Sequence, residues 1–289
     1  GSTYSDNMDL LKDIGCSTWE KMPYDPQDHV TWPEEAAWRE APLYRSRDGY
    51  RFMWVDSDAG LENLKNLLAD TNLAVISIDA SLYNQLTQDD LWTTELYEDP
   101  STNHANTIVG YDDNYGPYTE NGQQRYGAFK VVNSWGTGSW ENVTDGFYYI
   151  SYETMKQIIQ YIFFYENLRN YEPQMLAVFN MQHDYRGECE IGFGIGDPQS
   201  PDATKVMHGH YYYAGGDQPF PDNEMTLDIT ELQSHLDVGS DEIFQYVRDT
   251  ATPATGTLQS YEVEIYDDYR AQNVDAVYTS PDPPLQPIP

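Results

Sequence analysis

The sequence predicts an α+β chain with two domains, a mixed helix-and-strand region followed by an all-β region. Up to about residue 165, apolar side chains at helical spacing alternate with short β-branched runs. Beyond about Glu172, short alternating strands separated by Gly, Pro and Asp replace the helices. The 289 residues suffice for two domains, each with its own core.

The mixed region is expected to contain four helices and four strands. Residues 6–14 form the first helix, and Pro33 starts the second because proline suits the first helical turn. Ser57 or Asp58 caps a third helix with an apolar stripe. That stripe consists of Leu61, Leu64, Leu67 and Leu68. The four strands are expected at residues 73–80, 104–111, 126–133 and 146–150. Residues 151–165, with several isoleucines on one face, are predicted to be the fourth helix.

The all-β region is expected to be a jelly-roll-like β-sandwich over residues 172–275, after a mixed domain over residues 1–168. Its clearest strands are residues 175–179, 188–194, 225–229 and 261–266. Residues 276–289 are predicted to be an extended tail, because the last ten residues include five prolines. We expect such a tail to be ordered only when something holds it, for example a neighbouring subunit.

The charge of the chain excludes two classes of partner. Its 48 acidic and 15 basic residues give a formal net charge of −33, which repels nucleic-acid phosphates and anionic lipids. We therefore expect no nucleic-acid partner. We also expect no membrane span, because no apolar run approaches the roughly 20 residues that a spanning helix needs. The acidic residues are dispersed, which indicates a folded acidic surface. Frequent Tyr, Asn, Thr and Ser, scarce Lys and a glycosylation sequon favour a protein that is extracellular or at the cell surface.

The two cysteines leave two readings open. Cys16 and Cys189 could form one disulfide, or each could be a small buried apolar residue. Asn142 begins an Asn-Val-Thr glycosylation sequon, which is a weak indication of secretion.

Two stretches of sequence carry the chemistry. They are Asn-His-Ala at 103–105 with Ile-Val-Gly-Tyr at 108–111, and Asn-Ser-Trp-Gly at 133–136 with Asp-Gly-Phe-Tyr at 145–148. In this order and with these flanks they resemble the papain-like cysteine peptidases, over roughly residues 5–165. In that family a His opens one strand and an Asn in an Asn-Ser-Trp-Gly turn ends a neighbouring strand.

The resemblance implies a role for three residues. His104 is the base, Asn133 holds its imidazole in one orientation and tautomer, and Trp135 covers the bond between them. The chemistry is sound on physical grounds, because a thiolate nucleophile needs an adjacent imidazolium and that ring needs an orienting partner. The resemblance also suggests Ala80 and Asn103 as residues of the pocket for a substrate side chain. Ordinary strand packing explains both of them equally well.

The sequence departs from the family where the nucleophile should be. In the family a Gln and a Cys-Gly-Ser-Cys-Trp segment, at the head of a central helix, lie several dozen residues before the counterpart of Met-Pro-Tyr at 22–24, and this sequence begins after that segment. Cys16 matches a later part of the fold, and Cys189 belongs to the all-β region, so neither is expected to be the nucleophile. We therefore expect a papain-like domain that lacks its Cys-bearing helix and is inactive alone. A complementary N-terminal fragment, a neighbouring identical subunit or a rearranged segment of this chain should fill the gap.

Metal binding has only weak support in the sequence. Peptidases of this family need no cofactor. His208 and His210 share one strand face, but no ligand at suitable spacing completes a site. The pairs at 112–113 and 267–268 are adjacent aspartates that could hold a structural Ca²⁺, although chance pairs are expected in so acidic a chain.

Two functions therefore remain. In the first, the chain is the C-terminal portion of a secreted cysteine peptidase, and its thiol is on a partner chain. In the second, it is a catalytically silent extracellular subunit for assembly, filament formation or adhesion, as its abundant Tyr and Asn would suit. A faint similarity of residues 183–198 to the β-sandwich behind several secreted peptidases fits either function.

Overall fold

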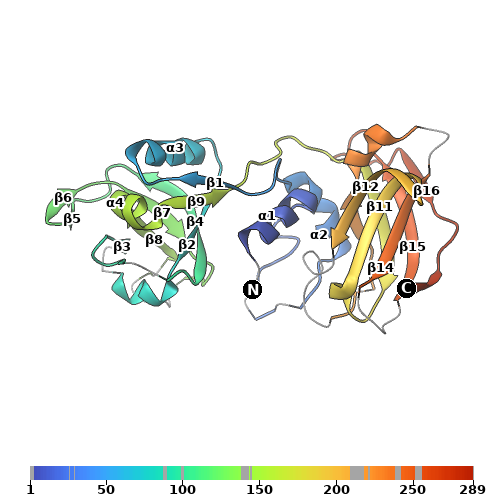
Figure 1. The fold of residues 1–289 in the computed structure, drawn as a ribbon, viewed down its shortest axis with the longest axis horizontal. Helices are drawn as coiled ribbons and strands as arrows, with labels where there is room; N and C mark the ends of the chain where they lie inside the picture. The colour runs from blue at the N-terminus through green and yellow to red at the C-terminus, as the bar shows by residue number, and fades with distance from the viewer. Residues whose placement is uncertain are drawn as a thin grey trace. The chain divides into compact units, whose positions relative to one another are not determined.

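A computed structural model gives the fold (Figure 1). It describes residues 3–25, 27–28, 30–86, 90–98, 101–137, 143, 145–208, 218–220, 222–237, 242–250 and 256–288. The chain is α+β, with many strands and few helices. None of the helices in these ranges is long and apolar enough to cross a membrane.

The chain divides into two compact units. The central unit is Arg47–Asn167, and the terminal unit combines Gly1–Ser46 with Leu168–Pro289. The expected mixed domain also included residues 1–46, which here group with the C-terminal sheets.

The central unit is built on a seven-stranded sheet with the order β1-β9-β2-β4-β7-β8-β3. Its strands are β1 (Arg51–Trp54), β2 (Ala74–Ile78), β3 (Leu91–Trp92), β4 (His104–Asp112), β7 (Ala128–Val132), β8 (Phe147–Ser151) and β9 (Tyr161–Phe164). A separate hairpin consists of β5 (Tyr118–Glu120) and β6 (Gln123–Arg125). The four predicted strands of this region are confirmed as β2, β4, β7 and β8.

Helix α3 (Asp58–Ala69) supplies the other layer of the central core. Ser57 caps it by accepting a hydrogen bond from Gly60 N at 3.2 Å, as the sequence predicts. Leu61 and Leu64 of the apolar stripe belong to the same hydrophobic cluster as the buried side chains of β2, where exposure alternates along the strand. Residues 80–85 form the 3₁₀ helix η2 (Ala80–Gln85) just after β2.

The helix predicted over residues 151–165 is wrong in its second half. A short α4 (Tyr152–Thr154) continues as the π-helix η3 (Met155–Ile159), and Gln160 then adopts a left-handed conformation with φ of 65°. The chain continues as β9, which pairs with β1 on one side and β2 on the other. The isoleucine spacing that suggested a helix therefore arises from two elements that share one core.

The terminal unit contains two sheets. One has the order β13-β10-β15-β16, with β17 also paired to β15, and the other has the order β12-β11-β14. The strands are β10 (Met175–Gln182), β11 (Cys189–Asp197), β12 (Ser200–His208), β13 (Met225–Asp228), β14 (Ile243–Asp249), β15 (Gly256–Ile265), β16 (Ala276–Thr279) and β17 (Leu285–Ile288). Short helices are η4 (Arg186–Glu188) and η5 (Thr230–His235). Side chains from both sheets, including Phe179 and Phe193, belong to one hydrophobic cluster.

The N-terminal helices belong to this unit. They are α1 (Tyr4–Asp13), α2 (Glu35–Glu40) and η1 (Ala41–Tyr44), close to where the sequence predicts two helices. Trp38 and Ala41 join the same cluster as the two sheets. Arg39 forms a bidentate pair with Glu264 of β15, at 2.6 and 3.1 Å.

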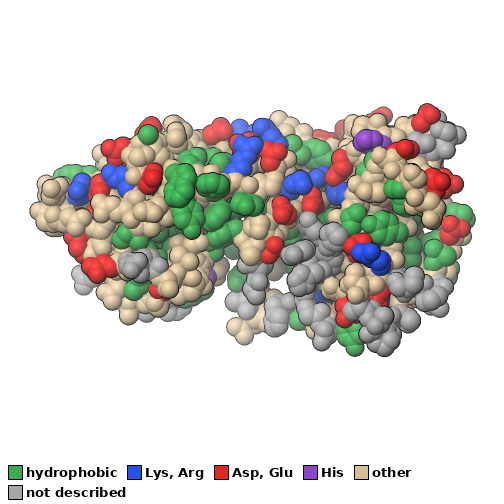
Figure 2. Space-filling view, in the orientation of Figure 1, with side chains coloured by type: hydrophobic (Ala, Val, Ile, Leu, Met, Phe, Trp, Pro, Cys, Tyr) green, Lys and Arg blue, Asp and Glu red, His purple; other side chains and the backbone are tan. Residues whose placement is uncertain are grey.

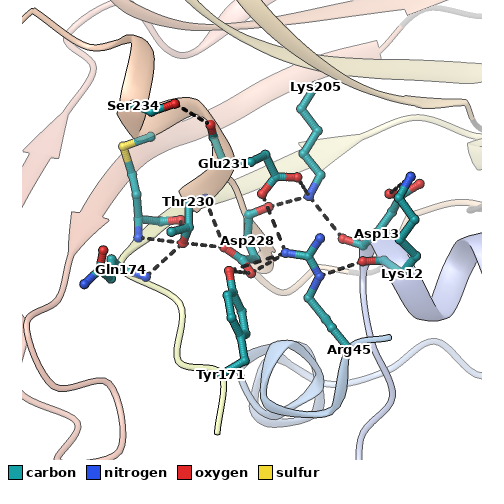
Figure 3. A network of polar contacts seen from close by, with 11 residues as sticks. Lys12, Asp13, Arg45, Tyr171, Gln174, Lys205, Asp228, Thr230, Glu231 and Ser234 are labelled. Carbon is teal, nitrogen blue, oxygen red and sulfur yellow. Dashed lines mark hydrogen bonds and ion pairs between the residues drawn. The ribbon is translucent and has the colours of Figure 1, made fainter. Parts of the chain in front are cut away.

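A second ion-pair network lies around the fully buried Asp228 side chain (Figure 3). Arg45 donates to Asp228 at 2.6 Å and to the Lys12 carbonyl at 2.6 Å. Lys205 donates to the Asp228 carbonyl at 2.7 Å and to the Asp13 carbonyl at 3.2 Å. The two cations thus bind the last carbonyls of α1 as well as the sheet, which fixes the N-terminal segment in place.

The proline-rich segment is not a separate tail. Residues 276–279 form β16, and the backbone of β17 pairs with β15 of the same sheet. The order of this segment therefore needs no neighbouring subunit, which removes one reason for expecting an assembly.

Candidate active site

The two motif residues come from neighbouring strands of the central sheet. His104 is the first residue of β4, and Asn133 follows the last residue of β7. Thr107 pairs with Val132, so the antiparallel register brings Asn133 back towards the start of β4. The Nε2 atom of His104 lies 2.9 Å from the Oδ1 atom of Asn133. The structure therefore brings the predicted base and its predicted orienting residue into hydrogen-bonding contact.

The direction of this hydrogen bond follows from the other contacts of Asn133. The backbone N–H of Ser134 can only donate, and it lies 2.8 Å from Asn133 Oδ1. Asn133 therefore presents an acceptor oxygen to His104, so Nε2 carries the proton. In that tautomer Nδ1 has the lone pair and can act as a base.

Trp135 lies against the imidazole. Its ring centroid is 5.2 Å from that of His104, with 37° between the planes, and 5.1 Å from that of Tyr83. Half of Trp135 is exposed, whereas Asn133 is buried. The indole therefore covers the hydrogen-bonded pair from one side, and its outer surface faces solvent.

Asn103 and Ala80 brace the segment before His104. Asn103 Oδ1 accepts from Ala80 N at 2.9 Å, and Asn103 Nδ2 donates to Asp79 at 2.7 Å. Asn103 N donates to Ile78 O at 2.9 Å. These contacts fix the start of β4, and the expected pocket role of the two residues stays a prediction.

A hollow of about 450 Å³ opens on the same unit. It is lined by Ser77, Thr102, Gln157, Ile158, Ile159, Gln160 and Tyr161. Ser77 pairs with Ala105, and successive residues of a strand point to opposite faces of the sheet, so Ser77 lies on the face opposite to the His104 side chain. Although the chain is very acidic, none of the lining side chains is charged, and four of them are amides or small hydroxyls.

Three further residues around Asn133 are not among the predicted site residues. Asn106, only 3% exposed, donates to Asn133 Oδ1 at 3.1 Å. Its own Oδ1 accepts from the hydroxyls of Tyr83 at 2.6 Å and Tyr148 at 2.8 Å. For Asn106 the only signal was an asparagine at a core-facing position of an otherwise apolar strand.

Both cysteines are free, so the disulfide reading is wrong. Cys16 is exposed, which also excludes the reading that both are buried, and Cys189 lies in the core of the terminal unit. Nearby protein atoms partly desolvate the Cys16 thiol and raise its pKa, and Glu40 raises it further. Burial, with Asp249 and Glu188, raises the pKa of the Cys189 thiol to about 12. Neither environment favours the thiolate that a nucleophile needs.

The described residues contain no group of three or more His, Cys, Asp or Glu side chains arranged to hold a metal. Several of the adjacent aspartates engage protein donors: Asp113 binds Lys65 and Tyr152, and Asp268 accepts from Ala271 N. Asn142, His210 and the His208 side chain lie outside the described part of the chain, so glycosylation and the His pair stay predictions.

One face of the central sheet carries exposed aromatic side chains. Phe52 and Trp54 of β1 are 58% and 55% exposed, and they pair across the strands with Phe163 and Tyr161 of β9. Figure 2 shows hydrophobic side chains gathered over β1 and β9. We call these four residues the aromatic face. It lies at the β1 edge of the sheet, two strands away from β4.

The solved structures similar to this chain include two cysteine proteases. No family profile and no curated protein matches the chain. Xylellain, a cysteine protease from Xylella fastidiosa, is 18% identical with a TM-score of 0.41, over 58% of this chain and 63% of its own. The cysteine protease and lectin-like domains of Cwp84, a surface layer associated protein of Clostridium difficile, are 16% identical with a TM-score of 0.40, over 96% of this chain and 67% of theirs. This chain thus spans less than two thirds of the Xylellain structure.

Likenesses of this strength leave the function to be argued from the residues of the chain itself.

Proposed function

We propose that this chain is the histidine–asparagine portion of an extracellular papain-like cysteine peptidase whose nucleophilic thiol belongs to another polypeptide. One observation carries the proposal: Asn133 Oδ1 accepts the Nε2 proton of His104 at 2.9 Å, beneath Trp135. The proposal includes the finer fold, a papain-like domain without its Cys-bearing helix and a jelly-roll-like β-sandwich behind it.

In the proposed reaction, His104 acts through Nδ1. This atom takes the proton of the incoming thiol, and the imidazolium then stabilises the thiolate that attacks the peptide carbonyl. His104 next donates the proton to the leaving amine as a general acid. Asn133 keeps the ring in place through both steps, because its oxygen accepts the Nε2 proton whether the ring is neutral or charged.

The environments of the chain's own two thiols support the proposal that the isolated chain is inactive. Both have a raised pKa, and Cys189 is buried in the hydrophobic core. The aromatic face supports the proposal of a partner polypeptide, since large exposed apolar surfaces are uncommon on monomeric proteins. Under this proposal the partner fragment covers the aromatic face and brings its thiol to His104.

Peptide hydrolysis tests the proposal. We expect the recombinant chain alone to cleave no peptide, and material from the native source to cleave peptides in a reaction that thiol alkylation stops. In that source His104→Ala should abolish cleavage, whereas Lys130→Gln, a surface change in β7, should leave it intact. Cleavage that survives both alkylation and His104→Ala would refute the proposal.

A second candidate function is a silent subunit for assembly or adhesion outside the cell. The aromatic face favours it, because aromatic side chains are enriched at protein interfaces. Under this reading Trp54→Ser, combined with Tyr161→Ser, should lower the oligomeric mass of the chain in light scattering. Native material would then show no cleavage at all.

A further inference from the structure

Asn106 uses its whole hydrogen-bonding capacity inside the candidate site. Its Nδ2 donates to Ala105 O at 2.8 Å and to Asn133 Oδ1 at 3.1 Å. Its Oδ1 accepts from the hydroxyls of Tyr83 and Tyr148 at 2.6 and 2.8 Å. Asn106, Tyr83 and Tyr148 are each at least 97% buried. A primary amide has two donor hydrogens and one acceptor oxygen with two lone pairs, so every position is filled.

These partners allow only one orientation of the Asn106 amide. A backbone carbonyl can only accept, so the nitrogen must face Ala105 O, and its second hydrogen then faces Asn133. The two tyrosine hydroxyls bind the opposite end of the amide. They also polarise it, which strengthens the Nδ2–H donor on the other side.

The Asn106 donor in turn constrains Asn133. A flipped Asn133 would place its own NH₂ group against the NH₂ of Asn106 and against the N–H of Ser134. Both contacts would then be donor against donor, inside a region that excludes water. Asn133 is therefore held with its oxygen towards His104, and His104 is held with its proton on Nε2.

We propose that Asn106 is a positioning residue, which fixes the Asn133 amide and thereby keeps the Nδ1 atom of His104 unprotonated. The tyrosine pair, Tyr83 and Tyr148, anchors it from behind. This role rests on the proposed function of His104 and Asn133, although it can be measured without any peptidase activity. Asn106 does not touch substrate or thiol, and it acts only through Asn133.

A merely structural role would predict something different. If Asn106 only satisfied the two tyrosine hydroxyls, its loss would destabilise the central unit and leave the His104 tautomer unchanged. The tautomer is therefore the informative readout, because global stability cannot separate the two roles.

The experiment is a long-range ¹H–¹⁵N correlation spectrum of the full-length, ¹⁵N-labelled chain at a pH where His104 is neutral. We expect the wild type to show the Nε2–H tautomer. Asn106→Leu removes the donor at similar volume, so the share of the Nδ1–H tautomer should rise about fivefold, the effect of one net hydrogen bond. The remaining Ser134 N–H contact keeps the change from being larger. An unchanged tautomer ratio in a folded variant would overturn the proposal.

Two further variants keep the test decisive. Tyr118→Phe removes another partly buried tyrosine hydroxyl, which donates to Gly127 O at 2.7 Å, and it should leave the His104 tautomer unchanged. If Asn106→Leu does not fold, Asn106→Asp keeps the shape and the tyrosine contacts but replaces the donor by an acceptor. It should shift the tautomer in the same direction, and a wild-type ratio in that folded variant refutes the role.

The outcomes separate this inference from the function beneath it. A wild-type tautomer ratio in the Asn106 variants removes the positioning role and leaves His104 and Asn133 as the proposed pair. Absent thiol-dependent cleavage in native material removes the peptidase function, even if Asn106 proves to control the tautomer.

Discussion

Replacing Asp228 by Asn should detach the N-terminal segment from the terminal unit more effectively than any surface change. The Asp228 side chain is fully buried, and it accepts hydrogen bonds from Arg45, Tyr171 and Thr230, each at 2.6 Å. In the variant an amide group replaces the charge beside Arg45, which is itself 9% exposed and lies 3.6 Å from Glu231. Breaking a buried ion pair on one side costs about 3–5 kcal/mol, because the other charge stays buried.

The assay is thermal unfolding followed by calorimetry, with the two units expected to give separate transitions. For a unit of this size, a loss of 1 kcal/mol in unfolding free energy lowers the Tm by about 2–4 °C. Asp228→Asn should therefore lower the Tm of the terminal unit by about 10 °C. The matched control is Arg270→Gln, which breaks the exposed pair with Glu172 in the same unit and should cost less than about 1 kcal/mol. A Tm change for Asp228→Asn no larger than that of the control would refute the reasoning.

Three further predictions concern acid, the indole cover and the aromatic face. Burial alone would raise the pKa values of Asp228 and Glu264. Arg45 and Lys205 instead hold the pKa of Asp228 below the usual carboxyl range, and Arg39 does the same for Glu264. As the pH falls, these carboxylates therefore bind protons in the unfolded chain at a higher pH than in the folded chain. The terminal unit should then lose stability below about pH 4, and its midpoint of urea unfolding should fall. Stability that is flat from pH 7 to 2 would contradict this. Trp135→Ala should expose the Nε2 proton of His104 and broaden its ¹H signal through exchange with water, and a signal as sharp as in the wild type would argue against the cover. Trp54→Ser should reduce binding of a hydrophobic dye while changing the unfolding free energy by less than about 0.5 kcal/mol, since the indole is already 55% exposed.

The strands that carry the candidate site were predictable, because their sequences are apolar runs next to distinctive polar residues. The β4 and β7 strands, with His104 and Asn133 at their ends, follow directly from that pattern. The C-terminal strands β10, β11, β13 and β15 were also found, since Gly, Pro and Asp mark their ends.

The remaining elements depend on contacts that a single sequence does not show. The sequence predicts a helix where β9 lies, because Ile158, Ile159 and Ile162 have helical spacing. The left-handed residue that ends the helical turn is Gln160 rather than a glycine, so the sequence does not indicate the turn. The N-terminal helices join the terminal unit through Arg39 and Arg45, whose partners lie 225 and 183 residues further along the chain. Asn106 was missed for the same reason, since its importance comes from Tyr83 and Tyr148, which lie on other elements.

The central claim is that His104 and Asn133 serve a thiol that another polypeptide supplies. The most direct measurement is labelling of native-source material with a thiol-reactive peptidase inhibitor, followed by a denaturing gel and intact mass of each band. We predict that a second polypeptide co-purifies with this 33.2 kDa chain, that one of its cysteines is labelled, and that His104→Ala prevents the labelling. The claim would be contradicted if folded native material contained this chain alone and no polypeptide in it were labelled.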